Sequence, residues 1–437
     1  MRPAAATIAI ASPTAEAFAR SLDAADPLAR FRTRFHLPPA TVYLDGNSLG
    51  LLSLDAEAEA RRALDQWRDL AIGGWLDADP AWFAIGEEVG AAMAPLVGAE
   101  PAAVVATGGT TANLHAMVAT FYRPSGRRRK IVATALDFPS DLYALAGQIR
   151  LHGGNPATDL VLVSSRNGRT IDEADIEAAL DHEVALAVLP SVLYASGQLL
   201  DIERLATAAR RRGIVAGFDC AHSVGVVPHR LVAWGVDWAV WCTYKYLNGG
   251  PGAVGALYVN RRHWFEEPAL TGWWGSDKTR QFDMATEFAG AAGAGRWQVG
   301  TPSVLATAPL RGSLRLFAEA GIAEVRAKSL AQTGYLLNLL ERTGLLGPPY
   351  GYGIATPHEE ARRGGHVAVT HPDGARIARA LKTRGFVPDF RPPDIVRLAP
   401  APLYTSYQEL WRTVQALKEV VDAGEHRRGA EGRDLVA

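Results

Sequence analysis

The sequence contains little cysteine. Its 437 residues include only two, Cys220 and Cys242, at a spacing that no metal-binding motif uses. A fold held by disulfides needs more cysteine than this, and the scarcity is typical of a reducing compartment. We therefore expect a cytoplasmic protein without a metal site, in which both cysteines are small, buried, apolar side chains.

The sequence also lacks a long apolar run and an excess of charge of either sign. No stretch reaches the roughly 18 uninterrupted apolar residues that a membrane span needs. The N-terminal stretch MRPAAATIAIASPTAEAF has a weakly basic start and soon meets Glu16, so it does not fit a signal peptide. With 45 basic and 46 acidic residues and a net charge of −1, neither nucleic acid nor a membrane is expected as a partner.

What the sequence does contain is a regular alternation of short apolar runs and helical stretches, from about residue 100. The expected strands are 103–107, 130–135, 160–163, 184–190, 214–218, 236–242 and 253–259. Strands that alternate with helices in this way predict an α/β fold with a mostly parallel sheet covered on both faces. Thr170 and Glu173 have the spacing of a capping box at the start of one helix. In such sheets ligands bind beyond the carboxyl ends of the strands.

The composition changes after about residue 310, where a long helical region precedes a Gly/Pro-rich loop and further short strands and helices. This change predicts a large domain over 61–310 and a smaller α+β domain over 311–425. The first 60 residues are expected to pack with the smaller domain, and the charged, glycine-containing tail 426–437 to be disordered.

Polar and aromatic residues follow several of the expected strands. Gly108–Thr111 opens a helix with backbone N–H groups and hydroxyls that suit an anion, although an ordinary glycine-rich turn would look the same. Asp219 ends an apolar strand, where a carboxylate needs a cationic partner, either a ligand or a structural ion pair. Lys245 follows the next strand and can act as a covalent nucleophile or a base. With Phe138 as a flat partner, these residues together predict pyridoxal 5′-phosphate, and the glycines of 248–252 would let the backbone pass close to it.

Seven motifs extend this pattern over nearly the whole chain. They are YLDGNSLG (43–50), FPSD (138–141), DCAHSVG (219–225), TYKYLNGGPG (243–252), GWWG (272–275), QVGTPSV (298–304) and VRLAPAPLYTSYQELW (396–411). In this order they closely resemble the kynureninases, a family of fold-type-I enzymes in the aspartate-aminotransferase superfamily. DGNSLG together with KYLNGGPG is specific to that family, whereas a lysine after a strand is common to all fold-type-I enzymes.

The resemblance implies a role for each matching position. Lys245 would bind the cofactor covalently, Asp219 would pair with its ring nitrogen and Phe138 would stack on its ring. The remaining cofactor positions are Thr110, Thr111, Asp141, His222, Tyr244, Trp273 and Thr301, the last reaching the phosphate from the partner subunit of a homodimer.

The resemblance also implies the substrate site. Its positions are Asn47, Trp75, Ser276, Gly300 and Arg397. Arg397 would grip the substrate carboxylate with its two-pronged guanidinium. Either Trp75 or Trp82 would line the aromatic pocket, and ordinary core packing is the alternative for each. Ser276 replaces a histidine of the animal members of the family, which points to a bacterial-type enzyme that prefers L-kynurenine to its 3-hydroxy form.

The implied reaction is hydrolysis of the Cβ–Cγ bond of L-kynurenine to anthranilate and L-alanine, in tryptophan catabolism or NAD biosynthesis. Lys245 would remove the α-proton. Tyr244 would relay a proton near Cβ, or only bond the phosphate. The alternatives are another fold-type-I enzyme, such as a class V aminotransferase or a cysteine desulfurase-like lyase, and a cofactor-binding regulator without turnover. Both cysteines lie within or beside expected strand ends, which disfavours a desulfurase.

Overall fold

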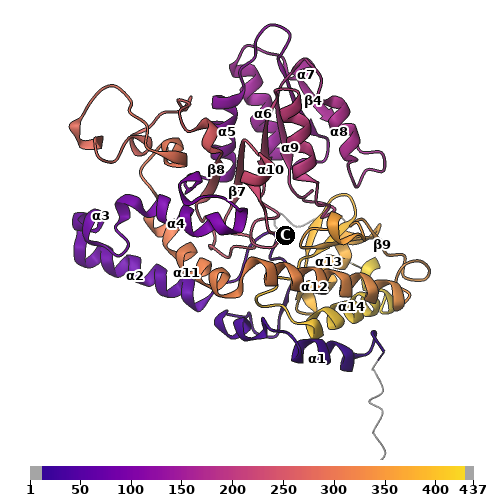
Figure 1. Cartoon of the computed structure of the whole chain (residues 1–437). Helices are drawn as coiled ribbons and strands as arrows, with labels where there is room; N and C mark the ends of the chain where they lie inside the picture. Colours follow the sequence, from indigo (N-terminus) through magenta and orange to yellow (C-terminus); the bar gives the residue numbers. More distant parts are fainter. Residues whose placement is uncertain (1–11, 429–437) are drawn as a thin grey trace, which may run out of the picture.

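The computed structural model, drawn in Figure 1, describes residues 12–428 and is built around a seven-stranded sheet. The strand order is β2-β8-β7-β6-β5-β3-β4, and only β8 runs against its neighbours. The strands are β2 (Val104–Ala106), β3 (Lys130–Thr134), β4 (Leu160–Val163), β5 (Val184–Pro190), β6 (Val215–Asp219), β7 (Trp238–Cys242) and β8 (Gly255–Val259). The predicted mostly parallel sheet and all seven predicted strands are confirmed.

Helices cover both faces of this sheet (Figure 1). The helices of this part of the chain are α2 (Leu54–Leu70), α3 (Gly74–Asp77), α4 (Ile85–Met93), α5 (Thr110–Phe121), α6 (Pro139–Leu151), α7 (Pro156–Asp159), α8 (Glu173–Ala179), α9 (Ile202–Arg211), α10 (Leu231–Trp234) and α11 (Val304–Ala320). Successive side chains of a strand point to opposite faces. In β7, Trp238 and Val240 therefore pack with α5 and α6, whereas Trp241 packs with α4, α9 and α10.

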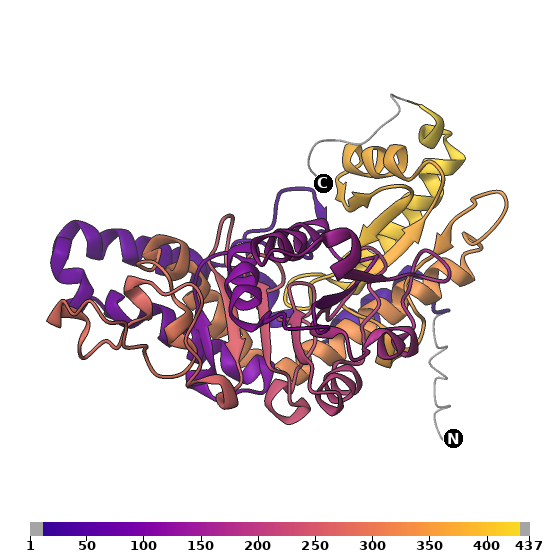
Figure 2. The ribbon, with the colours of Figure 1, turned by 90° about the horizontal axis from the view of Figure 1, so that it is seen from above.

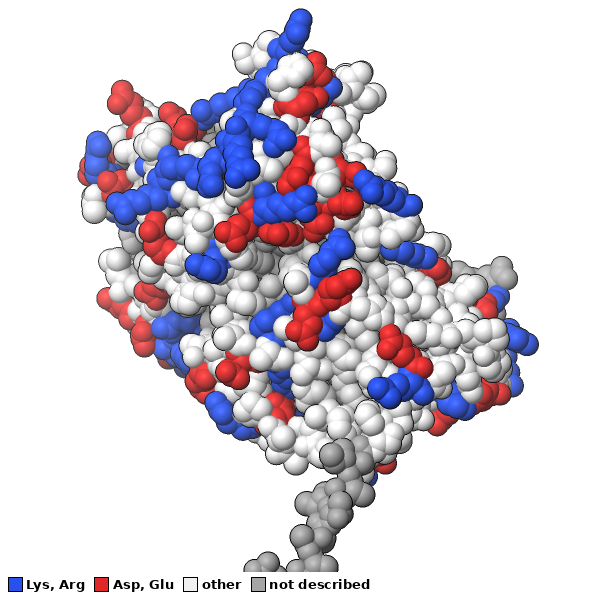
Figure 3. All heavy atoms as spheres, turned by 45° about the vertical axis from the view of Figure 1, so that its right-hand side comes forward, with Lys and Arg blue, Asp and Glu red and all other residues white. Residues whose placement is uncertain are grey.

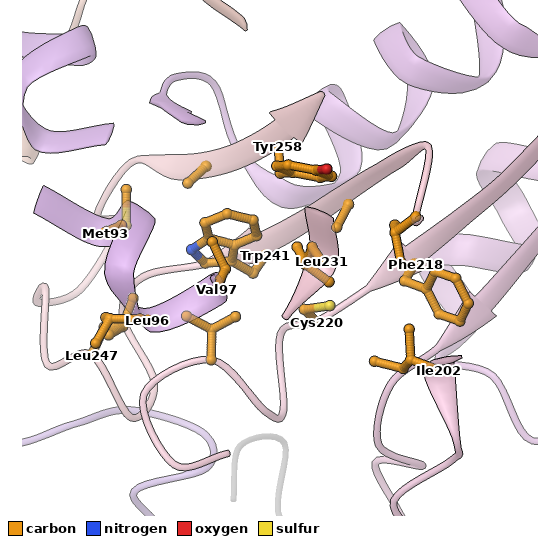
Figure 4. Packing of buried hydrophobic residues seen from close by; sticks show 14 of the residues in the cluster. Met93, Leu96, Val97, Ile202, Phe218, Cys220, Leu231, Trp241, Leu247 and Tyr258 are labelled. Atoms are coloured by element: carbon orange, nitrogen blue, oxygen red, sulfur yellow. The ribbon is translucent and has the colours of Figure 1, made fainter. Parts of the chain in front are cut away.

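Both cysteines lie in this core. Figure 4 shows Cys220 near Leu231 and Trp241, in one apolar cluster. Cys220 and Cys242 are buried and form no disulfide, as predicted. Burial raises the pKa of the Cys220 thiol to about 12, so this side chain behaves as a small apolar residue.

The predicted capping box at Thr170 and Glu173 is wrong. Helix α8 begins at Glu173, and its N-cap is Asp172, whose side chain accepts a hydrogen bond from the Ala174 amide. The Thr170 amide instead donates to Asn167 Oδ1 at 2.9 Å, within a turn before the helix. An aspartate directly before the helix is a strong N-cap, so it competed successfully with the threonine two residues earlier.

A second, antiparallel sheet lies toward the C-terminus, with strand order β12-β13-β10-β9. Its elements are α12 (Ile322–Arg342), β9 (Gly353–Ile354), β10 (Val367–Thr370), α13 (Gly374–Thr383), β11 (Phe386–Val387), β12 (Asp389–Arg391), β13 (Ile395–Leu398) and α14 (Tyr407–Asp422). Side chains from α12, α13 and α14 form one apolar cluster with β10 and β13. In Figures 1 and 2 this sheet and α3 lie at opposite ends of the molecule.

The start of the described chain packs against these C-terminal elements. Strand β1 (Val42–Tyr43) pairs in parallel with β11, and α1 (Glu16–Ala24) lies beside α14, where Trp411 Nε1 donates to the Thr14 carbonyl at 2.9 Å. The predicted domain limits stay predictions. The predicted tail 426–437 and the N-terminal stretch compared with a signal peptide lie largely outside the described residues.

The surface carries charges of both signs. On the face drawn in Figure 3, Lys and Arg lie among Asp and Glu, with several basic side chains side by side toward the top. Within residues 12–428, none of the helices is both long enough and apolar enough to cross a membrane.

Candidate active site

The predicted cofactor residues meet at the carboxyl ends of the parallel strands. Lys245 comes three residues after β7, and His222 comes three residues after β6. Lys245 Nζ lies 2.9 Å from His222 Nε2. His222 is buried, and burial together with the nearby Lys245 and Arg397 lowers the pKa of its imidazole well below the usual value. His222 is therefore neutral and can accept a hydrogen bond from the lysine.

Two carboxylates, Asp219 and Asp141, lie side by side at the same ends of the strands. Asp219 is the last residue of β6, and Asp141 lies in the first turn of α6. Asp219 Oδ1 accepts a hydrogen bond from the Ala221 amide at 2.7 Å. Burial and the neighbouring Asp219 carboxylate raise the pKa of Asp141 well above its usual value. No basic side chain of residues 12–428 forms an ion pair with either carboxylate, so a cationic ligand group would be stabilised between them.

The start of α5 provides the anion site that the sequence predicts. Its N-cap is Gly109, whose position offers no side chain to bond the free amides of the first turn. Gly108 has a φ of 52°, a left-handed conformation that glycine adopts without strain. Thr110 and Thr111 are the first two helical residues, so their hydroxyls and amides lie together at the positive end of the helix.

Thr301 and Gly300 lie near this turn in the same chain. They are exposed and line a cavity of about 270 Å³ together with Gly108, Ala112 and Val254. The prediction that Thr301 reaches the phosphate of a partner subunit is a separate matter and stays a prediction.

Phe138 lies at the start of α6 with 41% of its surface exposed. Its ring meets Tyr194 edge-on, with 5.1 Å between centroids. Tyr194 was missed in the sequence, although it comes shortly after β5, just as His222 comes shortly after β6. Its ring also lies 6.5 Å from that of His222, and its carbonyl accepts a hydrogen bond from Arg397 at 2.7 Å. Tyr194 thus connects the predicted cofactor and substrate residues.

Tyr244 immediately precedes Lys245 and is half-buried. Burial and the neighbouring Cys242 thiol raise the pKa of its hydroxyl, so this group stays protonated. Its carbonyl accepts a hydrogen bond from the Gly50 amide at 2.7 Å. A Cβ on Gly50 would lie 2.5 Å from the Lys245 carbonyl, so only glycine lets this loop come so close.

The predicted carboxylate clamp lies on the C-terminal sheet. Arg397 is 1% exposed in β13 and donates hydrogen bonds to Ser48 Oγ and to Asp389, another residue that the sequence did not reveal. Its Nε has no partner among the described residues. Asn47 is completely buried, and neither atom of its amide makes a hydrogen bond within this part of the chain. Both residues therefore have hydrogen-bonding capacity that a carboxylate could use.

We call Asp141, Asp219, His222, Lys245 and Arg397 the strand-end cluster.

The glycine loop after Lys245 has left-handed backbone at Asn248, Gly250 and Gly252, with φ values of 55°, 95° and 71°. The positive φ angles at Gly250 and Gly252 favour glycine at these two positions, whether or not a ligand lies close to the backbone.

The remaining predicted residues lie elsewhere. Trp75 belongs to α3, and its ring contacts Trp82 and Trp274 at 5.8 Å and 5.2 Å between centroids. We call Trp75, Trp82, Phe83, Trp274 and Phe282 the aromatic cluster. Trp273 is 43% exposed beside it, and Ser276 Oγ donates to the Trp273 carbonyl. In Figures 1 and 2 α3 lies at the end of the molecule away from the C-terminal sheet. Among the described residues, no printed ring contact or hydrogen bond connects Trp75, Trp273 or Ser276 with Lys245.

The aromatic cluster holds a cation that the sequence did not reveal. Lys278 Nζ lies 4.3 Å from the Trp274 ring centroid and 5.2 Å from that of Phe83. Burial lowers the pKa of Lys278 to about 8. Trp82 is buried under Gly74, where a Cβ would touch its ring, whereas Trp75 is only half-buried. Of the two tryptophans, Trp75 is thus the one that can meet a ligand.

Comparisons with known proteins give consistent matches. Residues 325–417 match the family model "Kynureninase C-terminal domain", and residues 68–230 match "DegT/DnrJ/EryC1/StrS aminotransferase family". The chain is 51% identical to the kynureninase of Geobacillus thermodenitrificans, over 97% of this chain and 98% of the relative. It is 48% identical to the kynureninase of Shouchella clausii, over 96% and 97% of the two chains.

Solved structures share the fold at low identity. A cysteine desulfurase from Thermococcus onnurineus superimposes with a TM-score of 0.76 at 18% identity, covering 90% of this chain and 98% of the other. A variant of the lyase C-DES, with glycine covalently linked to its PLP cofactor, gives 0.75 at 19% identity, covering 88% and 98%. These likenesses show a fold-type-I architecture, as predicted.

Proposed function

The chain belongs to the kynureninase family, and from this membership we infer that it hydrolyses the Cβ–Cγ bond of L-kynurenine. Water is consumed, and anthranilate and L-alanine are released. The enzyme is a pyridoxal-phosphate-dependent hydrolase of tryptophan catabolism, in the kynurenine pathway that also leads toward NAD.

The observation that best supports this reaction is the position of the loop 44–50. Its Gly50 amide donates to the carbonyl of Tyr244, next to Lys245, while Ser48 Oγ accepts from Arg397. One short loop therefore lies against both the backbone at Tyr244 and Lys245 and the carboxylate clamp. An α-amino acid held by its carboxylate at Arg397 would have its α-carbon directed toward Lys245.

The residues present fit pyridoxal 5′-phosphate. Asp219 and Asp141 form a carboxylate pair without a cationic partner among residues 12–428, which suits a protonated ring nitrogen. Phe138 offers an exposed ring, and the first turn of α5 offers uncapped amides for the phosphate. Lys245 would hold the cofactor covalently. When bound, pyridoxal phosphate supplies an electron sink conjugated to the substrate nitrogen.

Lys245 is the base that we assign to the α-proton. Its Nζ lies 2.9 Å from His222 Nε2, which is neutral and can accept a hydrogen bond from the protonated amine. This contact holds Nζ beside the buried His222, at the carboxyl ends of the parallel strands.

Arg397 and Asn47 hold the substrate carboxylate in this proposal. Both are buried and carry polar atoms without partners in the described chain, so binding a carboxylate there replaces no hydrogen bond to solvent. Asp389, already bonded to Arg397, orients the guanidinium.

Tyr244 is our candidate for the proton that Cβ gains when the bond to the γ-carbon breaks. Its hydroxyl stays protonated because burial raises its pKa, as a general acid requires. Water adds to the γ-carbonyl, whose carbon becomes the carboxylate of anthranilate.

We also propose a homodimer in which Thr301 reaches the phosphate bound by the partner subunit, and in which Trp75, Trp273 and Ser276 complete the partner's cofactor and substrate sites. Support comes from the place of α3, which carries Trp75, at the end of the molecule away from the C-terminal sheet (Figures 1 and 2). Large apolar side chains around α2 and α3 are also exposed, with Ile72 at 81%, Leu76 at 74% and Trp67 at 58%. Ser276 is consistent with a preference for L-kynurenine over its 3-hydroxy form. A cytoplasmic location is proposed because both cysteines are free.

The first test is a spectrum of the purified protein, followed by addition of L-kynurenine while anthranilate fluorescence is recorded. We expect a yellow protein that releases anthranilate and an equal amount of alanine. A yellow protein that releases neither would overturn the reaction and leave the cofactor site. A desulfurase alternative has no support, because Cys220 and Cys242 are 0% and 4% exposed.

A further inference from the structure

Ser191 is a buried residue to which the proposed reaction assigns no role. It directly follows β5 and is completely buried. Its amide donates a hydrogen bond to the carbonyl of Asp219 at 2.7 Å, and its Oγ donates to the same carbonyl at 2.9 Å. A carbonyl oxygen has two lone pairs, so Ser191 satisfies this acceptor completely. The backbone of Asp219 is therefore fixed to the end of β5 by two hydrogen bonds.

Two further buried side chains extend this arrangement from Ser191. Ser191 Oγ lies 2.7 Å from Ser223 Oγ, and Ser223 Oγ lies 2.8 Å from His229 Nε2. Ser223 is completely buried, and His229 is 3% exposed. We call Ser191, Ser223 and His229 the Ser–His network. Its members lie after β5 and after β6, so the network connects the ends of two strands that are paired in the large sheet.

The number of available protons determines the direction of these hydrogen bonds. Each serine hydroxyl has one proton, and that of Ser191 is donated to the Asp219 carbonyl. The carbonyl of Cys220, 3.1 Å from Ser223 Oγ, already accepts two backbone amides. Ser223 is therefore expected to donate its proton to Ser191 and to accept a hydrogen bond from His229.

His229 has the properties of a donor at the end of this network. Burial, together with the charge of Arg326, lowers the pKa of the His229 imidazole to about 4, so the ring is neutral and carries one proton. His229 Nδ1 is buried and has no hydrogen-bond partner within residues 12–428. A proton on Nδ1 would be a buried donor without an acceptor, whereas a proton on Nε2 is donated to Ser223. His229 is thus expected to carry its proton on Nε2.

We propose that Ser191, Ser223 and His229 are positioning residues that hold Asp219 in place for the ring nitrogen of pyridoxal phosphate. The hydrogen bonds run in one direction, from His229 Nε2–H through both hydroxyls to the Asp219 carbonyl, and hydrogen bonds in such a series strengthen one another. The peptide group of Asp219 is fixed in this way, and with it the α-carbon from which the carboxylate extends. This inference rests on the proposed role of Asp219 as the partner of the ring nitrogen.

The direction of the network can be measured in the wild-type holoenzyme. Histidine labelled with ¹⁵N gives different nitrogen shifts for the two neutral tautomers, and the signals that are missing from the His229→Gln variant identify His229. We expect a neutral ring with its proton on Nε2. A proton on Nδ1, or a charged ring near neutral pH, would overturn the proposal.

The effect on Asp219 can be measured on the cofactor itself. Bound pyridoxal phosphate with ¹⁵N in its ring shows by its nitrogen shift how far the ring nitrogen is protonated. We expect a protonated nitrogen in the wild type and, in Ser191→Ala, a signal moved toward that of an unprotonated ring, because one hydrogen bond to the Asp219 carbonyl is lost. His229→Leu should move the signal in the same direction but less, and His229→Gln, whose amide can also donate, should restore it. Unchanged signals in folded Ser191→Ala and His229→Leu would overturn the proposal.

A double variant separates a connected network from independent structural contacts. His229→Leu alone should lower kcat about fivefold, as expected for one buried hydrogen bond, with little change in KM. Added to Ser191→Ala, it should change neither kcat nor the ring-nitrogen signal further, because the link to Asp219 is already lost. The matched control is His371→Leu, which removes a buried histidine that is bonded to the Asp373 amide. Additive effects in the double variant, or an equal fall of kcat in the control, would overturn the proposal.

The proposed function and this inference fail in distinguishable ways. Absence of anthranilate release by the wild type would overturn the proposed reaction, whereas the ring-nitrogen signal of the bound cofactor would still test the network. A fully protonated ring nitrogen in Asp219→Asn would overturn the role of Asp219 and this inference with it. A shift of the signal in Asp219→Asn, without a shift in folded Ser191→Ala and His229→Leu, would overturn only the Ser–His network.

Discussion

The strand-end cluster and the aromatic cluster differ in which of their side chains lack contacts within the chain. In the strand-end cluster, buried charged and polar groups retain unpaired atoms, at His222 Nδ1 and Arg397 Nε among the described residues. In the aromatic cluster, the rings pack against one another, but Phe282 is 71% exposed and Trp273 beside it is 43% exposed. The first has buried polar atoms that a ligand could bond, and the second has exposed rings that another surface could cover. The proposed homodimer would bring these two parts together.

The largest effect is expected at Lys245. Lys245→Ala should abolish the yellow colour and lower anthranilate release by about 10⁴-fold or more, because the variant loses both the covalent link and the base. Fluorescence of anthranilate and the visible spectrum measure the two effects. Lys130→Ala, which changes only a surface ion pair with Glu183, is the control. Appreciable steady-state turnover by Lys245→Ala would contradict the assignment.

Arg397→Ala should raise KM for L-kynurenine about 100-fold and weaken alanine binding equally, because a buried charged hydrogen-bond partner is lost. Cofactor binding should change much less. Breaking the buried ion pair with Asp389 is also expected to lower the free energy of unfolding by about 3–5 kcal/mol. The stability of the variant in urea is therefore measured together with its kinetic constants. Arg391→Ala removes a more exposed contact of the same aspartate and serves as the control. An unchanged KM in Arg397→Ala would count against the clamp.

A mixture of two inactive variants tests whether the clusters act together across two chains. Trp273→Glu, which places a charge where the cofactor is expected, should be inactive alone, like Lys245→Ala. If the site is shared, co-refolding equal amounts should restore about a quarter of wild-type activity, because half the dimers then have one intact site. Light scattering measures the molecular mass and so shows whether the mixture contains dimers. No recovery in a mixture shown to contain mixed dimers would mean that both residues act in the same chain's site.

The two neighbouring tryptophans should respond differently. Trp75→Ala is expected to lower kcat/KM about tenfold with little loss of stability, because the half-buried ring would contact the substrate. Trp82→Ala should cost about 3–5 kcal/mol in unfolding free energy, since its buried ring fills the space beside Gly74. Steady-state kinetics measure the loss of kcat/KM in each variant, and urea unfolding measures the loss of stability. The reverse pattern would place Trp82 in the pocket.

The smallest effect concerns Asp45, which lies beside the strand-end cluster. Burial and Asp389 raise the pKa of Asp45 to about 6, above that of an unfolded aspartate. The protonated carboxyl therefore contributes stability that is present at low pH and lost as pH rises through about 6. Asp45→Asn should stabilise the protein by about 1–3 kcal/mol near pH 8 and by almost nothing near pH 4. Equal effects at both pH values would show that Asp45 is not held protonated.

Much of the fold could be predicted because its elements are local. The strands of the large sheet are short apolar runs, and the turns between them contain glycine at positions such as Gly108 and Gly252, where φ is positive. The position of Lys245 and Asp219 after their strands follows from the same pattern. The helix start at Glu173 was missed because Thr170 and Asp172 both suit an N-cap, and the sequence alone did not rank them.

The contacts that connect distant segments were not predictable. Tyr194 comes shortly after a strand, like His222, so the same rule could have found it, but nothing in the sequence connects it to Arg397. Asp389 and His366 carry no local signal at all. They lie near Arg397 and His222 only because β10, β12 and β13 bring them there.

The sequence by itself determined the family, the cofactor and the positions of the strands along the chain, since these depend on motifs and on short-range periodicity. Tertiary structure alone decided the order of the strands in the sheet and which of these residues meet. It brought Arg397 to Tyr194 and Ser48, packed Trp75 against Trp274 and placed the ring of His366 6.3 Å from that of His222. The physical reason is that burial and hydrogen bonding depend on atoms contributed by segments far apart in the sequence, which no local pattern specifies.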